Sequence, residues 1–329
     1  MKSTSLEEGF IVRHVEGRMP VDGNVSDAVA LLEAMSFDDA CDFVSAYARK
    51  SVDGGHGDDA VALLSGIASH EAPGDTLLIR AALKQVIAAV LIEQDDIDGA
   101  LDCIVEALKL LSENAKSKDV RFRSVLASLL YDLATVHAAR NEYSAAERTI
   151  ERSISIFDNL AKSNPQRYGS AHVYALKSAT SIYRSRIKQV NLLAHYQVAT
   201  STYLSMAVDG APAAVGKLVD SLVNEAETLL KLGKPRDAVR NLSRALKYLD
   251  KTEDSFTLRK LKVSVMLGTA LLHTFSTRQK GVHLLNTLLQ KAKKMGATAQ
   301  QEQIERLLDE NTSSLIDMLS RWHKMFSRK

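Results

Sequence analysis

The sequence predicts an all-α fold in which antiparallel helix pairs stack one after another. The first observation is a position that recurs in steps of 46 residues, at Ala100, Ala146, Leu192, Ala238 and Leu284. The second is an apolar residue four places after each of these, at Ile104, Ile150, Tyr196, Leu242 and Leu288. Residues four apart lie on one helix face, and a repeat of this length is typical of stacked helix pairs. The third is the small number of prolines, 5 in 329 residues, which permits long helices.

The N-terminal part of the chain departs from this repeat. Residues 1–25 contain no helical periodicity and are expected to form an arm. Residues 26–80 are expected to form atypical helices that include one degenerate repeat. The helices are expected over about 26–50, with an interruption near Ser36, and over about 58–70. Ser36 precedes Phe and two Asp residues and resembles a helix N-cap, because its hydroxyl can accept a hydrogen bond from an unpaired amide of the first turn.

Five repeats of about 46 residues are expected between residues 81 and 310. The turn inside the fourth repeat is the clearest, because Gly233 suits the end of one helix and Pro235 the first turn of the next. The third repeat is the least regular. Its turn is expected within residues 184–191, which contain neither Gly nor Pro.

A last helix is expected after the repeats. Residues 311–329 predict a capping helix that covers the exposed face of the last repeat and ends in a basic segment. The alternative is a helix that binds a partner or a membrane surface through Trp322 and Phe326, which lie among Lys and Arg residues.

Each expected first helix also carries a small position and a larger position three residues later. The small position holds Ala88, Ala134, Thr180, Ala226 and Leu272, and the larger one holds Leu91, His137, Tyr183, Leu229 and Phe275. These helix pairs resemble the tetratricopeptide repeat, a helix–turn–helix unit of about 34 residues. The resemblance covers about residues 60–295; the family's Trp is missing, and the longer period indicates a degenerate long-helix variant. It implies a right-handed α-α superhelix of stacked antiparallel helix pairs.

Charge and composition narrow the class of partner. Residues 1–80 carry 14 acidic and 6 basic side chains, so a DNA-reading segment is not expected there. Basic residues elsewhere are scattered rather than gathered into a stripe with aromatic residues, which argues against nucleic acid. We find no apolar run long enough to span a membrane and no secretion signal, so we expect a cytoplasmic protein with two reduced cysteines.

Sequence signatures of catalysis are weak. Gly210 and Gly216-Lys217 approach a phosphate-binding loop, but five residues intervene instead of four, and Leu218 replaces the Ser or Thr that would hold magnesium. The acidic cluster that begins at Asp95 is better explained by helix capping than by calcium binding. We therefore expect a protein that is not an enzyme, with no catalytic residue, metal or cofactor.

The resemblance implies where a partner would bind. In tetratricopeptide arrays, a peptide or helix lies in the concave groove, against first-helix residues that face away from the packing stripe. The matching residues are Tyr131, Asp132, Thr135, Tyr174, Lys177, Ser181, Asn224, Glu227 and His273. Lys177 and Asn224 match part of the carboxylate clamp of some family members. Ser181, Met266 and Ala270 replace its other members, so no such clamp is expected.

The predicted function is a non-enzymatic scaffold or adaptor that binds another protein or a peptide in the groove. One alternative is a peptide-sensing regulatory protein in which residues 1–80 act as the effector segment. A less favoured alternative is an enzyme with a site hidden in the groove. The sequence indicates neither the identity of the partner nor the oligomeric state.

Overall fold

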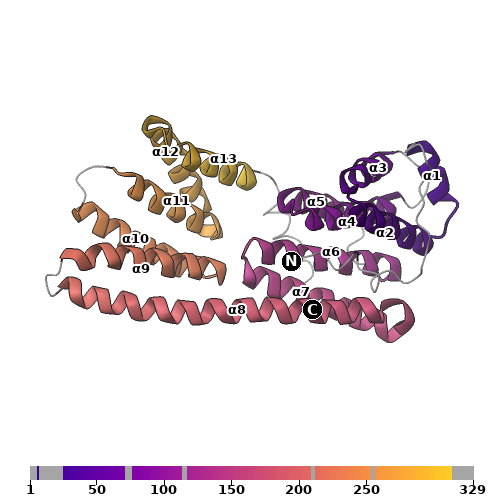
Figure 1. Ribbon diagram of the computed structural model, residues 1–329, viewed down its shortest axis with the longest axis horizontal. Coiled ribbons are helices and arrows are strands. Elements are labelled where there is room, and N and C mark those ends of the chain that lie inside the picture. The colour runs from indigo at the N-terminus through magenta and orange to yellow at the C-terminus, as the bar shows by residue number, and fades with distance from the viewer. Residues whose placement is uncertain are drawn as a thin grey trace. The chain divides into compact units, whose positions relative to one another are not determined.

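The structure is a computed structural model that describes residue 6 and residues 25–70, 76–112, 117–208, 212–252 and 256–312. These residues contain thirteen α-helices and no strand, so the predicted all-α class is confirmed (Figure 1). The chain divides into two compact units, residues 1–183 (unit 1) and residues 184–329 (unit 2).

Unit 1 contains seven complete helices and the start of an eighth. They are α1 (Val25–Glu33), α2 (Phe37–Asp53), α3 (Gly57–Ser69), α4 (Thr76–Glu93), α5 (Ile97–Ser112), α6 (Val120–Ala139), α7 (Tyr143–Ser163) and α8 (Pro165–Val208). Helices α4 and α5 pack against each other, as do α6 and α7, and α6 contacts both helices of the preceding pair. Helices α2 and α3 both contact α4. Helix pairs therefore stack in chain order, as the sequence predicts.

The helix break predicted near Ser36 is confirmed. Helix α1 ends at Glu33, and α2 begins at Phe37 with Ser36 as its N-cap. The Ser36 hydroxyl accepts the Asp39 amide N–H at 3.2 Å. This hydrogen bond satisfies one of the four amides that a helix start leaves unpaired.

The recurring sequence position marks a buried helix contact in unit 1. Its residues in α5 and α7, together with the apolar residues four places later, have no exposed surface; these are Ala100, Ile104, Ala146 and Ile150. Because Ala carries only a methyl group, the backbone of a neighbouring helix can approach closely there, and the larger side chain fills the space beside it.

Five turns in the described part of the chain share one backbone geometry. Their left-handed residues are Gly55, Asp95, Asn141, Gly233 and Gly296, with φ between 61° and 77°. In the turn before Pro235, the Gly233 N–H donates to the Leu230 carbonyl and the Lys234 N–H donates to the Leu229 carbonyl. This is the Schellman arrangement, which pairs carbonyls that a helix end leaves free. Gly, Asn and Asp tolerate left-handed φ, which explains the residue types at these turns.

The predicted turn inside the third repeat is wrong. Helix α8 runs without interruption for 44 residues, from Pro165 to Val208, through the segment 184–191 where the turn was expected. At about 1.5 Å per residue, this helix is roughly 66 Å long. The physical reason is visible in the sequence, since 184–191 contains neither Gly nor Pro, the residues that most often end a helix.

Unit 2 contains the rest of α8 and five further helices. They are α9 (Pro212–Lys231), α10 (Pro235–Thr252), α11 (Leu258–Leu272), α12 (Arg278–Met295) and α13 (Thr298–Thr312). Helices α9 and α10 form one pair and α11 and α12 another, and α10 contacts α11 between them. Helix α10 begins at Pro235, as predicted.

Two of the five recurring positions are assigned to the wrong residues. Leu192 is only partly buried, and its neighbour Leu193 belongs to the core of unit 2. In α12 the buried small residue is Gly281, 43 residues after Ala238, whereas Leu284 is only partly buried. A side chain at Gly281 would meet the Gly268 carbonyl oxygen at 3.0 Å, so two helix backbones nearly touch here.

The predicted ends fall largely outside the described residues. Of the N-terminal arm, 1–25, only Leu6 and Val25 are described, and Leu6 is buried in the core of unit 1. Residues 313–329, which contain Trp322 and Phe326, are not described. Helix α13 packs against α11 and α12, so the helix that covers the last pair begins at Thr298. Among the described helices, none combines the length and the apolar character needed to cross a membrane.

The close approach at Gly281 predicts opposite effects for two Gly→Ala substitutions in unit 2. Gly281→Ala places a methyl group 3.0 Å from two backbone atoms of α11 and should destabilise the protein by about 1–3 kcal/mol. Gly216→Ala in α9 meets no atom within 4 Å and should stabilise it by up to about 1 kcal/mol through helix propensity. Urea unfolding followed by circular dichroism measures both. If both substitutions change the free energy of unfolding equally, helix propensity alone accounts for them, and the close contact at Gly281 has no effect on stability.

Candidate functional site

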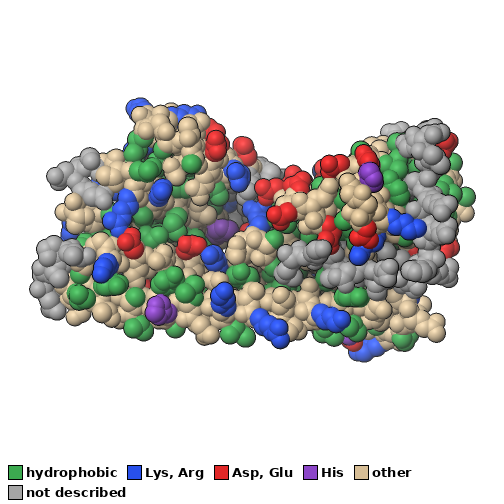
Figure 2. All heavy atoms as spheres, viewed as in Figure 1, with side chains coloured by type: hydrophobic (Ala, Val, Ile, Leu, Met, Phe, Trp, Pro, Cys, Tyr) green, Lys and Arg blue, Asp and Glu red, His purple; other side chains and the backbone are tan. Residues whose placement is uncertain are grey.

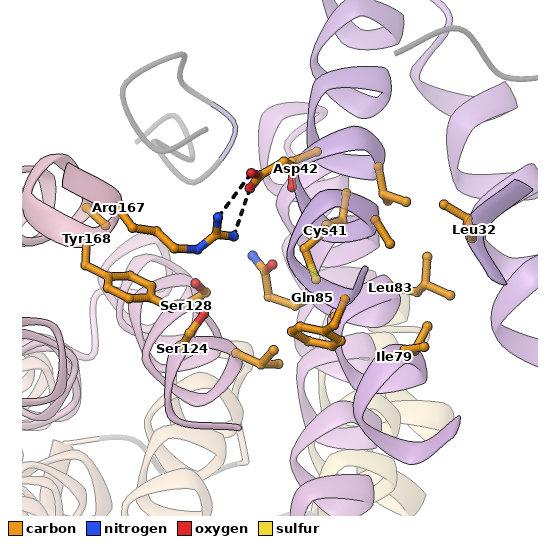
Figure 3. A pocket seen from close by; sticks show the side chains of 18 of the residues that line it. Leu32, Cys41, Asp42, Ile79, Leu83, Gln85, Ser124, Ser128, Arg167 and Tyr168 are labelled. Carbon is orange, nitrogen blue, oxygen red and sulfur yellow. Dashed lines mark hydrogen bonds and ion pairs between the residues drawn. The ribbon is translucent and has the colours of Figure 1, made fainter. Parts of the chain in front are cut away.

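A pocket of about 100 Å³ lies inside unit 1 (Figure 3). It is lined mainly by α2, α4, α6 and the start of α8, with one side chain each from α1 and α7. Cavities of about 150 Å³ accept a benzene-sized group, so this pocket suits one apolar side chain or a few waters. The apolar part of the lining includes Leu32, Phe37, Val44, Ile79, Leu83, Val86, Val125 and Phe157.

A buried ion pair crosses the pocket. Arg167, in the first turn of α8, donates two hydrogen bonds to the Asp42 carboxylate of α2, at 3.2 and 3.3 Å (Figure 3). Its guanidinium also lies 3.4 Å from Asp38. The Arg167 side chain is 15% exposed and that of Asp42 is 8% exposed. A bidentate pair with this burial has fixed geometry, and it joins two helices that are 125 residues apart in the chain.

The two carboxylates keep Arg167 charged. Burial alone lowers the pKa of its guanidinium, but the charges of Asp42 and Asp38 raise the pKa more. The guanidinium carbon also lies 5.8 Å from the centre of the Tyr168 ring. Around this end of the pocket, two carboxylates therefore face one cation.

Cys41 and Tyr168 stay protonated at neutral pH. Burial raises the pKa of the Cys41 thiol to about 12, and the neighbouring charges of Asp42 and Asp38 add to the rise. Burial also raises the pKa of the Tyr168 phenol. A thiol needs its thiolate form to attack a substrate or bind a metal, so Cys41 is unsuited to both roles at neutral pH.

Two further polar contacts join helices inside unit 1. Gln85, which lines the pocket from α4, donates its amide N–H to the Asp132 carboxylate of α6 at 2.7 Å. The Tyr131 hydroxyl lies 3.1 Å from the Ser178 hydroxyl of α8. Both contacts are between helices, and they satisfy hydrogen-bonding groups in the interior of unit 1.

Three of the residues predicted to face the groove lie in the core instead. Tyr131 and Asp132 have no exposed surface and Thr135 is 1% exposed. The Thr135 hydroxyl donates to the carbonyl of Tyr131 within α6. Helix α6 contacts α4, α5 and α7, so a large part of its circumference is covered by neighbouring helices. The assignment of these three residues to an exposed binding surface is therefore wrong.

The other predicted groove residues do not line the pocket. On α8, Lys177 and Ser181 are exposed, and Tyr174 is half-buried with the Lys177 ammonium 5.0 Å from its ring centre. In unit 2, Asn224 is half-buried and Glu227 is exposed beside Lys231, with which it forms an ion pair at 2.8 Å. His273 is exposed at the C-terminal end of α11.

The sequence analysis missed the polar residues that do line the pocket, which include Asp42, Ser45, Gln85, Ser124, Ser128, Arg167 and Tyr168. One signal was available for Asp42, because it interrupts the apolar stripe that α2 forms with Ala40, Phe43, Val44 and Ala48. A carboxylate in such a stripe requires a partner to offset its desolvation. Nothing in the local sequence identifies Arg167 as that partner.

Comparison with known proteins adds no assignment. No family model matches this chain, and no curated protein was found to be significantly similar to it.

Within the described residues, no group of three or more His, Cys, Asp or Glu side chains is arranged to hold a metal ion. In the turn before α5, the Asp96 carboxylate accepts the Gly99 N–H at 3.0 Å, which is a capping interaction.

The buried ion pair predicts a large stability loss on substitution. Arg167→Met leaves the Asp42 carboxylate buried without its bidentate partner and should lower the free energy of unfolding by roughly 3 kcal/mol. Lys162→Met is the control, because Lys162 forms an exposed pair with Asp158 on α7 and should change stability little. Chemical denaturation measures both variants. If both variants lose the same free energy of unfolding, the buried pair stabilises the protein no more than an exposed pair does.

The high pKa of Cys41 predicts unusual thiol reactivity. In a Cys103→Ser background, the rate of alkylation should keep rising to above about pH 10, because the thiolate fraction grows until the pKa is reached. The same protein in urea should reach a plateau about one unit above pH 8.5, as an ordinary cysteine does. A plateau near pH 9.5 in the folded protein would contradict the assigned environment of Cys41.

Proposed function

We propose that this protein is a non-enzymatic scaffold or adaptor that binds a peptide or helix of another protein. In this proposal the helix pairs form a tetratricopeptide-like superhelical array. The pocket of unit 1 is the part of the groove that receives the partner.

The position of the pocket carries the proposal. Four helices line most of it, and α2, α4 and α6 are the first helices of successive pairs, while α8 follows the last of these pairs. In arrays of stacked helix pairs, the first helices line the concave surface on which partners bind. The pocket is thus lined by the helices that the resemblance expects to form the groove, which supports the proposal, although the lining residues differ from those predicted.

The chemistry of the lining indicates what fits. The apolar wall suits one aliphatic or aromatic side chain, and the Ser124 and Ser128 hydroxyls add hydrogen-bonding capacity at one side (Figure 3). Asp38 is nearly half exposed next to the pair formed by Asp42 and Arg167. A peptide with a cationic residue close to its apolar anchor would complement this excess of negative charge.

The two alternatives have weaker support. Residues 25–69 pack into the same core as α4, through Leu64, Ile67 and Val86 among others. A segment that shares its core with the array is less suited to act as a separate effector. For an enzyme, Cys41 is the nearest candidate nucleophile in the pocket, and its raised pKa disfavours that role.

A pocket-filling substitution tests the proposal. A displayed library of random peptides is selected on the full chain, and the enriched peptides are synthesised and measured by fluorescence anisotropy. Ser128→Phe places a ring in the pocket and should weaken binding at least about tenfold, which corresponds to about 1.4 kcal/mol. Ser128→Leu, a smaller change, should give a smaller loss in the same direction.

The matched control is Ser155→Phe, which makes the same substitution at an exposed position of α7. It should bind as the wild-type protein does, and circular dichroism should show all variants to be folded. If Ser128→Phe binds as tightly as the control, or if no peptide is enriched, the pocket is not the binding site.

A further inference from the structure

Helix α8 carries an exposed apolar row that nothing in the described residues covers. In unit 2 this row consists of Ile187, Val190, Ala194 and Val198, and we call it the α8 stripe. Ile187 is 61% exposed and Val198 is 66% exposed, which is unusual for aliphatic side chains of this size.

The α8 stripe lies on the side of the helix away from the core of unit 2. The opposite face packs through Leu193 against α9, and the Thr200 hydroxyl lies 2.9 Å from the Ser221 hydroxyl of α9. Residues 187, 190, 194 and 198 are separated by three, four and four positions, so they fall on one helix face. The apolar row is therefore a continuous surface rather than a set of scattered exposed residues.

The spacing resembles one side of a coiled coil. Val173, Leu176 and Thr180 precede the α8 stripe on the same helix, and the steps from residue 173 to residue 194 are three, four, seven, three and four, so each half of the row has one step of three and one of four. Alternating steps of three and four give an average of 3.5 residues, the period at which a second helix packs along the first. A flat membrane surface requires no such period.

The charges beside the α8 stripe have one sign. Helix α8 contains five Lys or Arg and no Asp or Glu among its 44 residues. Arg184 and Lys188 are exposed one turn apart, along one side of the stripe. Figure 2 shows Lys and Arg side chains among hydrophobic ones along the lower edge of the view, where α8 runs in Figure 1.

A second copy of this chain would be a poor occupant. Two α8 helices packed through the stripe would bring Arg184 and Lys188 of one copy toward the cations of the other, and like charges across an interface are unfavourable. A helix with Asp or Glu beside its apolar row would instead be attracted at these positions.

We propose that the α8 stripe binds an acidic amphipathic helix of a partner protein. The partner helix packs its apolar row against Ile187, Val190 and Val198 and pairs its carboxylates with Arg184 and Lys188. The α8 stripe shares no residue with the pocket of unit 1. A test of peptide binding in the pocket therefore does not test helix binding to the stripe, and the reverse is also true.

Two synthetic helices of about three heptads test the proposal. Both carry Leu at alternating steps of three and four; one has Glu and the other Lys beside the Leu row. The wild-type protein should bind the Glu helix at least about tenfold more tightly than the Lys helix in fluorescence anisotropy. The preference should shrink as salt rises, because exposed charges are screened.

Two double variants separate the apolar and the charged contributions. Ile187→Asp with Val198→Asp should weaken binding of the Glu helix at least about tenfold. Arg184→Glu with Lys188→Glu should reverse the preference, so that the Lys helix binds more tightly. The control is Lys247→Glu with Lys251→Glu, which makes the same charge change at exposed positions four apart on α10 and should keep the wild-type preference.

Circular dichroism and thermal unfolding establish that each variant is folded, which is expected because all substituted positions are exposed. The proposal is overturned if the wild-type protein does not bind the Glu helix, or if the charge reversal leaves the preference unchanged. It is also overturned if sedimentation shows that the wild-type protein forms a dimer and that the Ile187→Asp, Val198→Asp variant does not. The same holds if vesicles that contain phosphatidylserine bind the wild-type protein but not this variant.

Discussion

The close contact of paired helices at a small residue is the constraint on which the rest of this structure depends. Ala100, Ala146 and Ala238 have no exposed surface, and Gly281 takes the same role where two backbones nearly touch. At such a contact any larger side chain would push the helices apart. The pairs keep their spacing because of these residues, and the pairs in turn stack through their first helices in unit 1.

The pocket of unit 1 follows from this stacking. Helices α2, α4 and α6 are held side by side by their own pairs, and α8 continues from α7 next to them. The pair formed by Arg167 and Asp42 then joins α8 to α2 across the pocket. A buried ion pair makes a weak net contribution to stability but has demanding geometry. Its main structural effect here is to give the pocket a defined shape at its polar end.

Helix α8 shows how an exception to the repeat creates a surface. A turn within residues 184–191 would have produced a further helix pair, with the two helices covering each other's apolar residues. Because the helix continues instead, Ile187, Val190 and Val198 have no paired helix within the described chain. The same uninterrupted helix contains no carboxylate. Apolar and cationic side chains therefore remain together on its exposed side.

The sequence by itself predicted the all-α class, the break near Ser36 and the turn before Pro235. These features depend on interactions between residues a few positions apart, such as the Ser36 cap and the left-handed Gly233, so local sequence encodes them. At 184–191 the absence of Gly and Pro agrees with the continuous helix, whereas the regular spacing predicted a turn that the structure does not contain. The spacing also misplaced the small residue of α12, because Leu284 matches the period while Gly281 makes the contact.

Only the tertiary structure decided which side chains are buried and which residues meet. Tyr131, Asp132 and Thr135 look like one polar face of a helix, but neighbouring helices cover them. Asp42 and Arg167 are 125 residues apart, and no local pattern pairs them. The physical reason is that burial and long-range contacts depend on how helices stack around each residue. A helical period specifies one apolar face, but it does not specify how many further faces the neighbours will cover.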